Sequence, residues 1–269
     1  MNDVIRRETG NVQPAASQAT LTEQARAIAE VQAAVTVAQQ VRRDQGRADA
    51  EMQSVCARMA VANKAFYSIP NRGSGPTVHL MRELARIWGN IDYGVKELNR
   101  DDNAGVSEVQ AYAWDQETNV KSTRSFIVPH ERMARKTRQK LTDLGDIYLN
   151  NQNVGARAVR ECIATVLPTW FTDEAQALCQ ATLQNGDGEP LPARIEKMLG
   201  AFHKHNVTQA MIEAKLKRKR TAWSAGDLAE LTTIFQSLER REITAEEAFP
   251  QAVSMDDLVG SKEAQEVQE

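Results

Sequence analysis

The sequence is poor in the residues that build most metal and redox sites. Its 269 residues include only three cysteines and four histidines. Cys56, Cys162 and Cys179 are isolated from one another and form no CxxC pair, so we expect a reduced, cytosolic protein. His203 and His205 lie two residues apart, a spacing that does not place two ligands on one helix face.

The sequence also lacks the motifs of nucleotide-driven and hydrolytic enzymes. It contains no G-x-x-x-x-G-K-[ST] loop, no G-x-G-x-x-G after a strand and no G-x-S-x-G elbow. No apolar run is long enough for a membrane span of about 18–20 residues. The pair Asp101-Asp102 lies in a turn-rich segment, where Asp is a turn former. We therefore predict a non-enzymatic protein with no cofactor, no metal and no membrane contact.

Charge is abundant but unevenly distributed. The total is −3, which by itself disfavours a nucleic-acid partner. Residues 121–140, however, carry seven Lys and Arg against Glu131 alone, a local net charge of +6. Residues 239–269 carry nine acidic residues against three basic ones, a net charge of −6. The net charge of −3 is small because the charges of these two segments cancel, so it does not exclude a nucleic-acid partner.

Helical periodicity marks the first part of the chain. Apolar residues recur at steps of three and four over residues 22–43, which predicts a helix that packs either inside its own domain or against another subunit. A second helix is expected over residues 49–66. Residues 68–76 hold two prolines and two glycines and predict a loop. A third helix is expected over residues 77–88, ended by Gly89.

Over the next forty residues the spacing of apolar residues changes from the helical period to that of strands. Residues 91–98, 106–115 and 120–128 are three β-type segments joined by short polar links, which predicts an antiparallel β-meander. In the second segment Gln110, Tyr112 and Trp114 share one face. In the third, Ser122, Arg124 and Phe126 share a face.

Helices are expected again after a basic loop that ends near residue 145. The fold class is therefore α+β, with a three-stranded meander, packed helices and a small C-terminal helical bundle. Thr208 and Ser224 are expected N-caps. The expected helices are residues 146–167, 173–183, 194–202, 208–216 and 225–240, with a last turn at 244–249. The expected divisions are a flexible arm (1–20), a core with oligomerisation helices (21–184), an exposed linker (185–192), a helical domain (193–249) and an acidic flexible tail (250–269).

The basic run and the strand aromatics together predict a surface for single-stranded nucleic acid. Cations neutralise phosphates, and aromatic rings stack on bases. Two alternatives stay open: the run is a solvated loop, or the aromatics Tyr112, Trp114 and Phe126 fill the core. The candidate binding residues are Lys121, Arg124, Arg132, Arg135, Lys136, Arg138, Lys140, Arg157, Arg160, Tyr112 and Trp114.

A second basic run follows the helix expected at residues 208–216. We interpret it as an auxiliary nucleic-acid contact or as a surface for acidic partners. Cations at a helix C-terminus also complement the helix dipole, which is the competing interpretation. The run consists of Lys215, Lys217, Arg218, Lys219 and Arg220.

Four segments, taken in order, resemble phage single-strand annealing proteins of the RecT, Redβ and Erf types. They are residues 88–94 (WGNIDYG), 108–115 (EVQAYAWD), 125–130 (SFIVPH) and 151–160 (NQNVGARAVR). The likeness extends over residues 54–183, about half of the chain. It implies a β-β-β-α core preceded by helices.

The resemblance implies ATP-independent annealing of complementary single strands in phage recombination. It also implies a homo-oligomeric ring or filament that holds single-stranded DNA and the annealed duplex intermediate. The C-terminal helices would then contact an exonuclease or a single-strand-binding protein. Two other classes remain open: a non-enzymatic phage structural or adaptor protein, and a metal-dependent nuclease, for which no carboxylate cluster is apparent.

Overall fold

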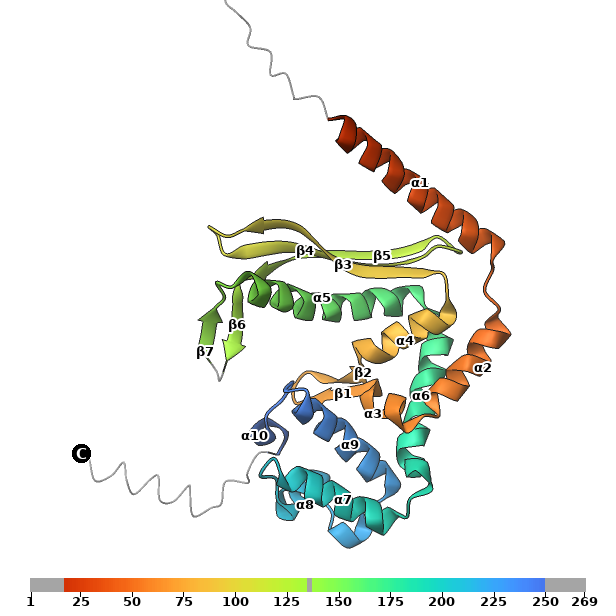
Figure 1. Ribbon diagram of the computed structural model, residues 1–269. Helices are drawn as coiled ribbons and strands as arrows, with labels where there is room; N and C mark the ends of the chain where they lie inside the picture. Colours follow the sequence, from red (N-terminus) through yellow and green to blue (C-terminus); the bar gives the residue numbers. More distant parts are fainter. Residues whose placement is uncertain (1–16, 135–136, 250–269) are drawn as a thin grey trace, which may run out of the picture. The chain divides into compact units, whose positions relative to one another are not determined.

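The computed structural model describes residues 17–134 and 137–249, and it is an α+β chain (Figure 1). About 60% of it is helix and 20% strand, which confirms the predicted class. The described residues divide into two units, one ending at Arg42 and one beginning at Arg43. The predicted acidic tail and most of the predicted arm lie outside the described residues.

The first unit contains helix α1 (Gln18–Gln40). Ser17 caps it by accepting a hydrogen bond from the backbone N–H of Thr20, so the helix begins four residues earlier than the periodicity predicts. Several of its apolar residues face solvent, with Ile28 60% exposed and Val31 51% exposed, whereas Ala38 is buried. The predicted helix is therefore confirmed, and these two side chains join no core among the described residues of the first unit.

The second unit is organised around a three-stranded antiparallel sheet of β3 (Ile91–Asp101), β4 (Val106–Asp115) and β5 (Val120–Pro129), in that order. The antiparallel sheet is confirmed. Both links between strands contain residues in the left-handed region, Gly105 at φ 68° and Asn119 at φ 58°. These two residue types adopt that region most readily, which explains why both turns are visible in the sequence.

Helix α5 (Leu144–Val166) lies along one face of this sheet (Figure 1). The sheet meets it with the small buried side chains of Val109, Ala111 and Ala113. Gly155 allows the close approach, because a Cβ at this position would lie 2.7 Å from a methyl carbon of Val95. The predicted inward residues Val154 and Ala158 of this helix are only half-buried.

Four further helices surround this core. The predicted single helix over residues 49–66 is wrong, because Ala57 and Arg58 separate two helices and a strand begins at Phe66. The helix predicted over 77–88 is confirmed, with Thr77 as N-cap and Gly89 at φ 74° after its end. These helices are α2 (Gln45–Cys56), α3 (Met59–Ala65), α4 (Val78–Trp88) and α6 (Thr169–Asn185).

The loop predicted over residues 68–76 is a β-hairpin. Strands β1 (Phe66–Ile69) and β2 (Gly73–Pro76) pair antiparallel, with Tyr67 opposite Gly75. Glycine and proline argue against a central strand, but both strands of a two-stranded ribbon are edges, where these residues are tolerated. The prediction failed because the partner strand lies within the same glycine-rich segment.

The predicted basic loop before α5 is also a hairpin. Strands β6 (Glu131–Ala134) and β7 (Thr137–Lys140) pair antiparallel, with Glu131 opposite Lys140. The described side chains of both strands are exposed. Without a buried face the sequence shows no period-two apolar pattern, which is why periodicity did not reveal these strands.

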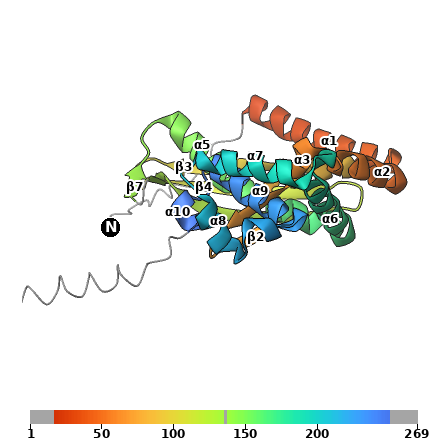
Figure 2. The same cartoon turned by 90° about the horizontal axis from the view of Figure 1, so that it is seen from below.

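Residues 186–249 form helices around a second hydrophobic cluster that includes Phe202, Ile212 and Leu231. Helices α7 and α9 lie side by side in both views (Figures 1 and 2). Thr208 and Ser224 cap α8 and α9 as predicted. The segment expected as an exposed linker is mostly exposed and holds a short turn, η1 (Gly186–Gly188). The other elements are α7 (Leu191–His203), α8 (Gln209–Leu216), η2 (Arg220–Ala222), α9 (Ala225–Glu239) and α10 (Ala245–Ala248).

Candidate nucleic-acid interface

The face of the β3–β5 sheet that points away from α5 carries Tyr112 at its centre. The ring lies over Gly94, where an added Cβ would be 3.2 Å from the ring. The ammonium nitrogen of Lys96 lies 4.7 Å from the ring centroid, and the hydroxyl donates to Asp92 at 3.3 Å. Burial and the nearby Asp92 carboxylate raise the pKa of Tyr112 above its usual value, so the hydroxyl stays neutral at neutral pH.

Trp114 lies two residues further along β4, on the same outward face. Its indole N–H donates to the side-chain oxygen of Asn119 at 3.0 Å. Lys121, its register partner on β5, lies with its ammonium nitrogen 5.8 Å from the ring centroid. Both aromatic rings are half-buried and each has a lysine beside it. We call Lys96, Tyr112, Trp114 and Lys121 the outward-face cluster.

The outward-face cluster has the components of a single-strand binding surface. Aromatic faces can stack on bases, and adjacent ammonium groups can neutralise phosphates. Phe126 does not belong to it, because Phe126 is the register partner of buried Val109 and packs against the core. Lys96 was not among the predicted residues, since only the strand register shows that it shares a face with Tyr112.

The other predicted cations of the core lie on different surfaces. Arg124 is the register partner of Ala111, so it belongs to the sheet face that α5 covers, and it is exposed. Arg157 on α5 is exposed as well. Arg160 is half-buried, bonds to Glu161 at 2.8 Å and lies 4.8 Å over the ring of Tyr67 in β1.

The β6–β7 hairpin carries the remaining cations of the first basic run. Arg132 lies 4.0 Å from the carboxylate of Asp146, and Arg138 lies 3.8 Å from that of Glu131. Lys140 is exposed and has no ion-pair partner among the described residues. Arg135 and Lys136 lie outside the described residues. The first basic run therefore occupies the outward face, the α5 side and a separate hairpin.

The second basic run is largely engaged within its own helical unit. Lys219 pairs with Glu213 at 2.8 Å and Arg218 pairs with Asp227 at 3.1 Å. The bond from Lys219, with further bonds from Gln209 and the Arg220 backbone, lowers the pKa of Glu213 to about 2. Arg220 pairs with Glu196, and Lys215 lies 5.9 Å over the Phe249 ring, which leaves the exposed C-cap residue Lys217. This pairing favours a structural role.

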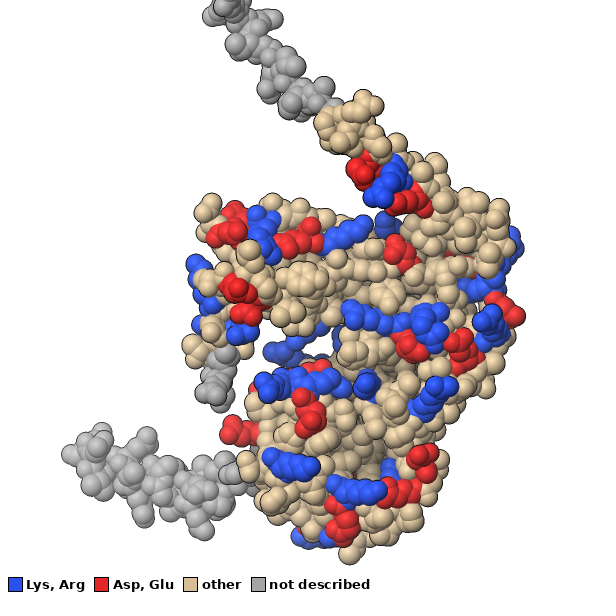
Figure 3. All heavy atoms as spheres, viewed as in Figure 1, with Lys and Arg blue, Asp and Glu red and all other residues tan. Residues whose placement is uncertain are grey.

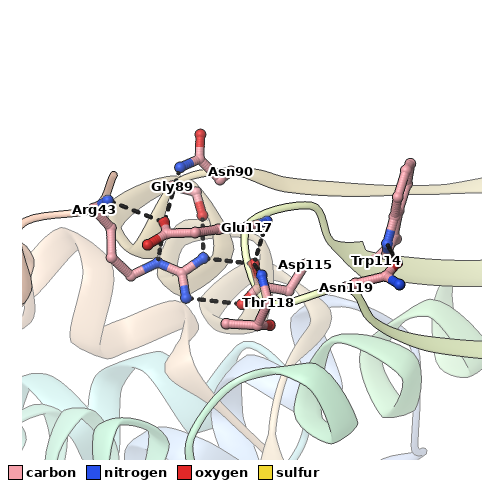
Figure 4. Close-up of polar contacts among 8 residues, drawn as sticks. All are labelled: Arg43, Gly89, Asn90, Trp114, Asp115, Glu117, Thr118 and Asn119. Carbon is pink, nitrogen blue, oxygen red and sulfur yellow. Dashed lines mark hydrogen bonds and ion pairs between the residues drawn. The ribbon is translucent and has the colours of Figure 1, made fainter. Parts of the chain in front are cut away.

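A buried ion cluster fixes the turn that carries Asn119 (Figure 4). Arg43 donates two hydrogen bonds to Asp115, at 2.7 and 2.8 Å, and its side chain is only 7% exposed. Its backbone N–H donates to Glu117 at 3.0 Å, and Asn90 donates to the same carboxylate oxygen. Because Asp115 and Glu117 begin the β4–β5 turn, the cluster positions Asn119 and, through it, the indole of Trp114.

Burial opposes ionisation of Asp115, but the bonds from Arg43 and Thr118 outweigh it and hold the pKa of Asp115 below its usual value. Asp115 is therefore a carboxylate at neutral pH, and its bidentate pair with Arg43 is fully charged. None of the sequence patterns above singles out Arg43. Its partner Asp115 lies 72 residues away in the sequence, so no pattern of nearby residues predicts the pair.

A second buried polar group joins the far ends of the three strands. Ser107 Oγ lies 2.9 Å from His130 Nε2 and donates to Glu97 at 3.0 Å. Ser107 is fully buried, so no substrate reaches its hydroxyl, and the contacts serve to hold β3, β4 and the end of β5 together. Asp101 acts in the adjacent turn, as predicted, by accepting the N–H of Ala104.

The described part of the chain holds no group of three or more His, Cys, Asp or Glu side chains placed to bind a metal ion. Within the same residues, no helix is both long and apolar enough to cross a membrane. No protein-family model matches this sequence, and neither a curated protein nor a solved structure shows significant similarity to it.

Proposed function

We propose that this protein binds single-stranded nucleic acid on the outward face of the β3–β5 sheet and anneals complementary strands without nucleotide hydrolysis. The observation that carries the proposal is the outward-face cluster, in which Lys96 lies beside Tyr112 and Lys121 beside Trp114. Tyr112 and Trp114 lie two residues apart on one strand face, so two bases of a nucleic-acid strand can stack on neighbouring rings. The lysines supply a salt-dependent, sequence-independent attraction for the phosphates.

The resemblance to phage single-strand annealing proteins is the reason to propose annealing in addition to binding. It rests on the β-β-β-α order, in which a meander of β3, β4 and β5 precedes α5, and on a small helical bundle at residues 193–249. In this proposal the protein acts as a phage recombinase inside the bacterial cytoplasm, as a homo-oligomeric ring or filament. The C-terminal bundle would contact an exonuclease or a single-strand-binding protein.

The test replaces both rings of the outward-face cluster. We expect Tyr112→Leu with Trp114→Leu to weaken binding of a labelled oligo-dT, because base–aromatic stacking contributes about 1–3 kcal/mol per base. Roughly tenfold weaker binding per lost ring corresponds to about 1.4 kcal/mol. Fluorescence anisotropy measures the affinity, and annealing of complementary labelled strands without ATP measures the activity.

Tyr148→Leu is the matched control, since Tyr148 is 55% exposed but lies on α5. Circular dichroism should show unchanged secondary structure in all variants. Equal affinities of the Tyr112/Trp114 variant and the control would contradict the assignment of the site. No oligonucleotide binding by the wild-type protein at low salt would contradict the function itself.

The alternative is a non-enzymatic phage structural or adaptor protein built on oligomerising helices. The exposed apolar side chains of α1, including Ile28 and Val31, favour it, because exposed apolar residues along one helix mark an association surface. An adaptor would form oligomers without binding oligonucleotides. The same anisotropy measurement, combined with the molecular mass in solution, separates the two functions.

A further inference from the structure

A cluster of cations that belongs to neither basic run surrounds His79 on α4. Lys64 lies in the last turn of α3, and its carbonyl accepts a hydrogen bond from the Thr77 hydroxyl at 2.5 Å. The backbone N–H of Thr77 bonds to the carbonyl of Ala65 at 2.8 Å. These bonds hold the end of α3 against the start of α4, so that Lys64 and His79 are neighbours.

The end of α9 completes the cluster. Arg240 donates to the carbonyl of Phe66 in β1 at 2.9 Å, which brings its guanidinium beside the α3–β1 junction. Arg82 lies one turn after His79 on α4. We call Lys64, His79, Arg82 and Arg240 the His79 surface. Its members come from three helices that are distant in the sequence, which is why no charge run marks it.

The His79 surface is electropositive beyond what its own acids neutralise. Burial, together with the charges of Arg240, Arg82 and Lys64, lowers the pKa of His79, and Glu242 alone opposes them. The side chains of Lys64 and Arg82 are exposed and have no hydrogen-bond or ion-pair partner among the described residues. Two unpaired cations beside a histidine that resists protonation show a local excess of positive charge.

Further cations lie between the His79 surface and α5. Arg160 of α5 lies over Tyr67, the residue after Phe66, whose carbonyl Arg240 binds. Figure 3 shows Lys and Arg side chains on both sides of a hollow between α5 and the β1–β2 hairpin. Arg160 and Arg240 on this path are paired with Glu161 at 2.8 Å and Glu242 at 3.1 Å, so phosphates would meet unpaired cations at Arg82 on α4 and Lys64 on α3.

We propose that the His79 surface is a second phosphate-binding surface for single-stranded nucleic acid, separate from the outward-face cluster. The inference rests on the proposed function. The ligand class follows from the chemistry: exposed, unpaired Lys and Arg side chains bind a polyanion through counterion release, without reading bases. The outward-face cluster offers rings as well, so the two surfaces make different kinds of contact.

The test uses the full chain with Lys64→Gln and Arg82→Gln, which remove two charges and break no bond described here. Each phosphate contact contributes about 0.7 to the slope of log affinity against log salt for single strands. The double variant should therefore lower the slope for oligo-dT by about 1.4. The matched control is Arg47→Gln with Lys204→Gln, two exposed cations without ion-pair partners among the described residues.

A third variant, His79→Gln, reports on the histidine itself. Wild-type affinity should rise as the pH falls through and below about 6.5, because His79 gains a proton near bound phosphate, and the variant should show a smaller rise. A slope equal to that of the control overturns the inference and leaves the outward-face cluster standing. No oligo-dT binding by the wild-type protein overturns both proposals, and loss of binding only in Tyr112→Leu with Trp114→Leu overturns the His79 surface alone.

Discussion

At the scale of single residues, the loss of the Arg43 side chain should strongly destabilise the second unit. Arg43→Ala leaves the carboxylate of Asp115, only 3% exposed, buried without its partner. Removing one member of a buried pair costs about 3–5 kcal/mol, because the other charge is left uncompensated. Urea denaturation should show a loss of this size, and the neighbouring exposed residue gives the control, Arg42→Ala. Equal stability of the two variants would contradict the described pair.

The same pair gives the molecule a defined acid sensitivity. The pKa of Asp115 lies below its ordinary value of 3.8, so the folded state favours the carboxylate. The stability that this provides is present above the ordinary pKa and is lost as the pH falls through the lowered one. The wild-type free energy of unfolding should therefore fall below about pH 4, and the Arg43→Ala variant should show a shallower fall over that range.

At the scale of elements, the contact of α5 with β3 depends on a glycine. In Gly155→Ala the new Cβ would lie 2.7 and 2.8 Å from the two methyl carbons of Val95, so the helix must move off the sheet. We expect a loss of about 1–3 kcal/mol, as for other overpacked cores. Gly200→Ala in α7 meets open space and should stabilise by about 0.5–1 kcal/mol, because alanine favours a helix.

The melting temperatures of the two glycine variants should therefore change in opposite directions, falling for Gly155→Ala and rising for Gly200→Ala. A second change, Val95→Ala, removes the two methyl groups and should recover part of the stability that Gly155→Ala loses. A melting temperature of Gly155→Ala at or above that of the wild type would show that α5 does not approach β3 as described.

The elements that the sequence predicts well are those with their own local signals. Helix α4 has an apolar stripe with Thr77 before it and Gly89 after it, and β4 alternates small buried residues with outward aromatics. The two hairpins β1–β2 and β6–β7 lack such signals, because β1–β2 is built from a segment rich in glycine and proline and the described side chains of β6–β7 are all exposed. The outward position of Tyr112 and Trp114 was also left open by the sequence, since alternation separates two faces without saying which one a helix covers.

At the scale of the whole molecule, the net charge of −3 conceals how the cations are distributed. Residues 121–140 form one basic segment in the sequence, but the strand register places Lys121 on the outward face and Arg124 on the opposite face. The His79 surface gathers cations from α3, α4 and α9 that are far apart in the chain. Segment counts therefore find an excess of charge but do not find the surface that presents it, because surfaces are made by tertiary contacts.

The state of assembly also belongs to this scale, and α1 provides its test. Ile28 and Val31 are 60% and 51% exposed, one turn apart, and are expected to contact other subunits in the proposed ring or filament. Ile28→Lys with Val31→Lys should lower the mass measured by sedimentation while leaving helix content unchanged, since exposed positions accept lysine. The control, Thr22→Lys with Gln40→Lys, adds the same charge at exposed polar positions on the opposite side of α1 and should keep the wild-type mass. A monomeric wild-type protein, or a variant that assembles like the control, would contradict association through these residues, and binding by the outward face would then be a property of single subunits.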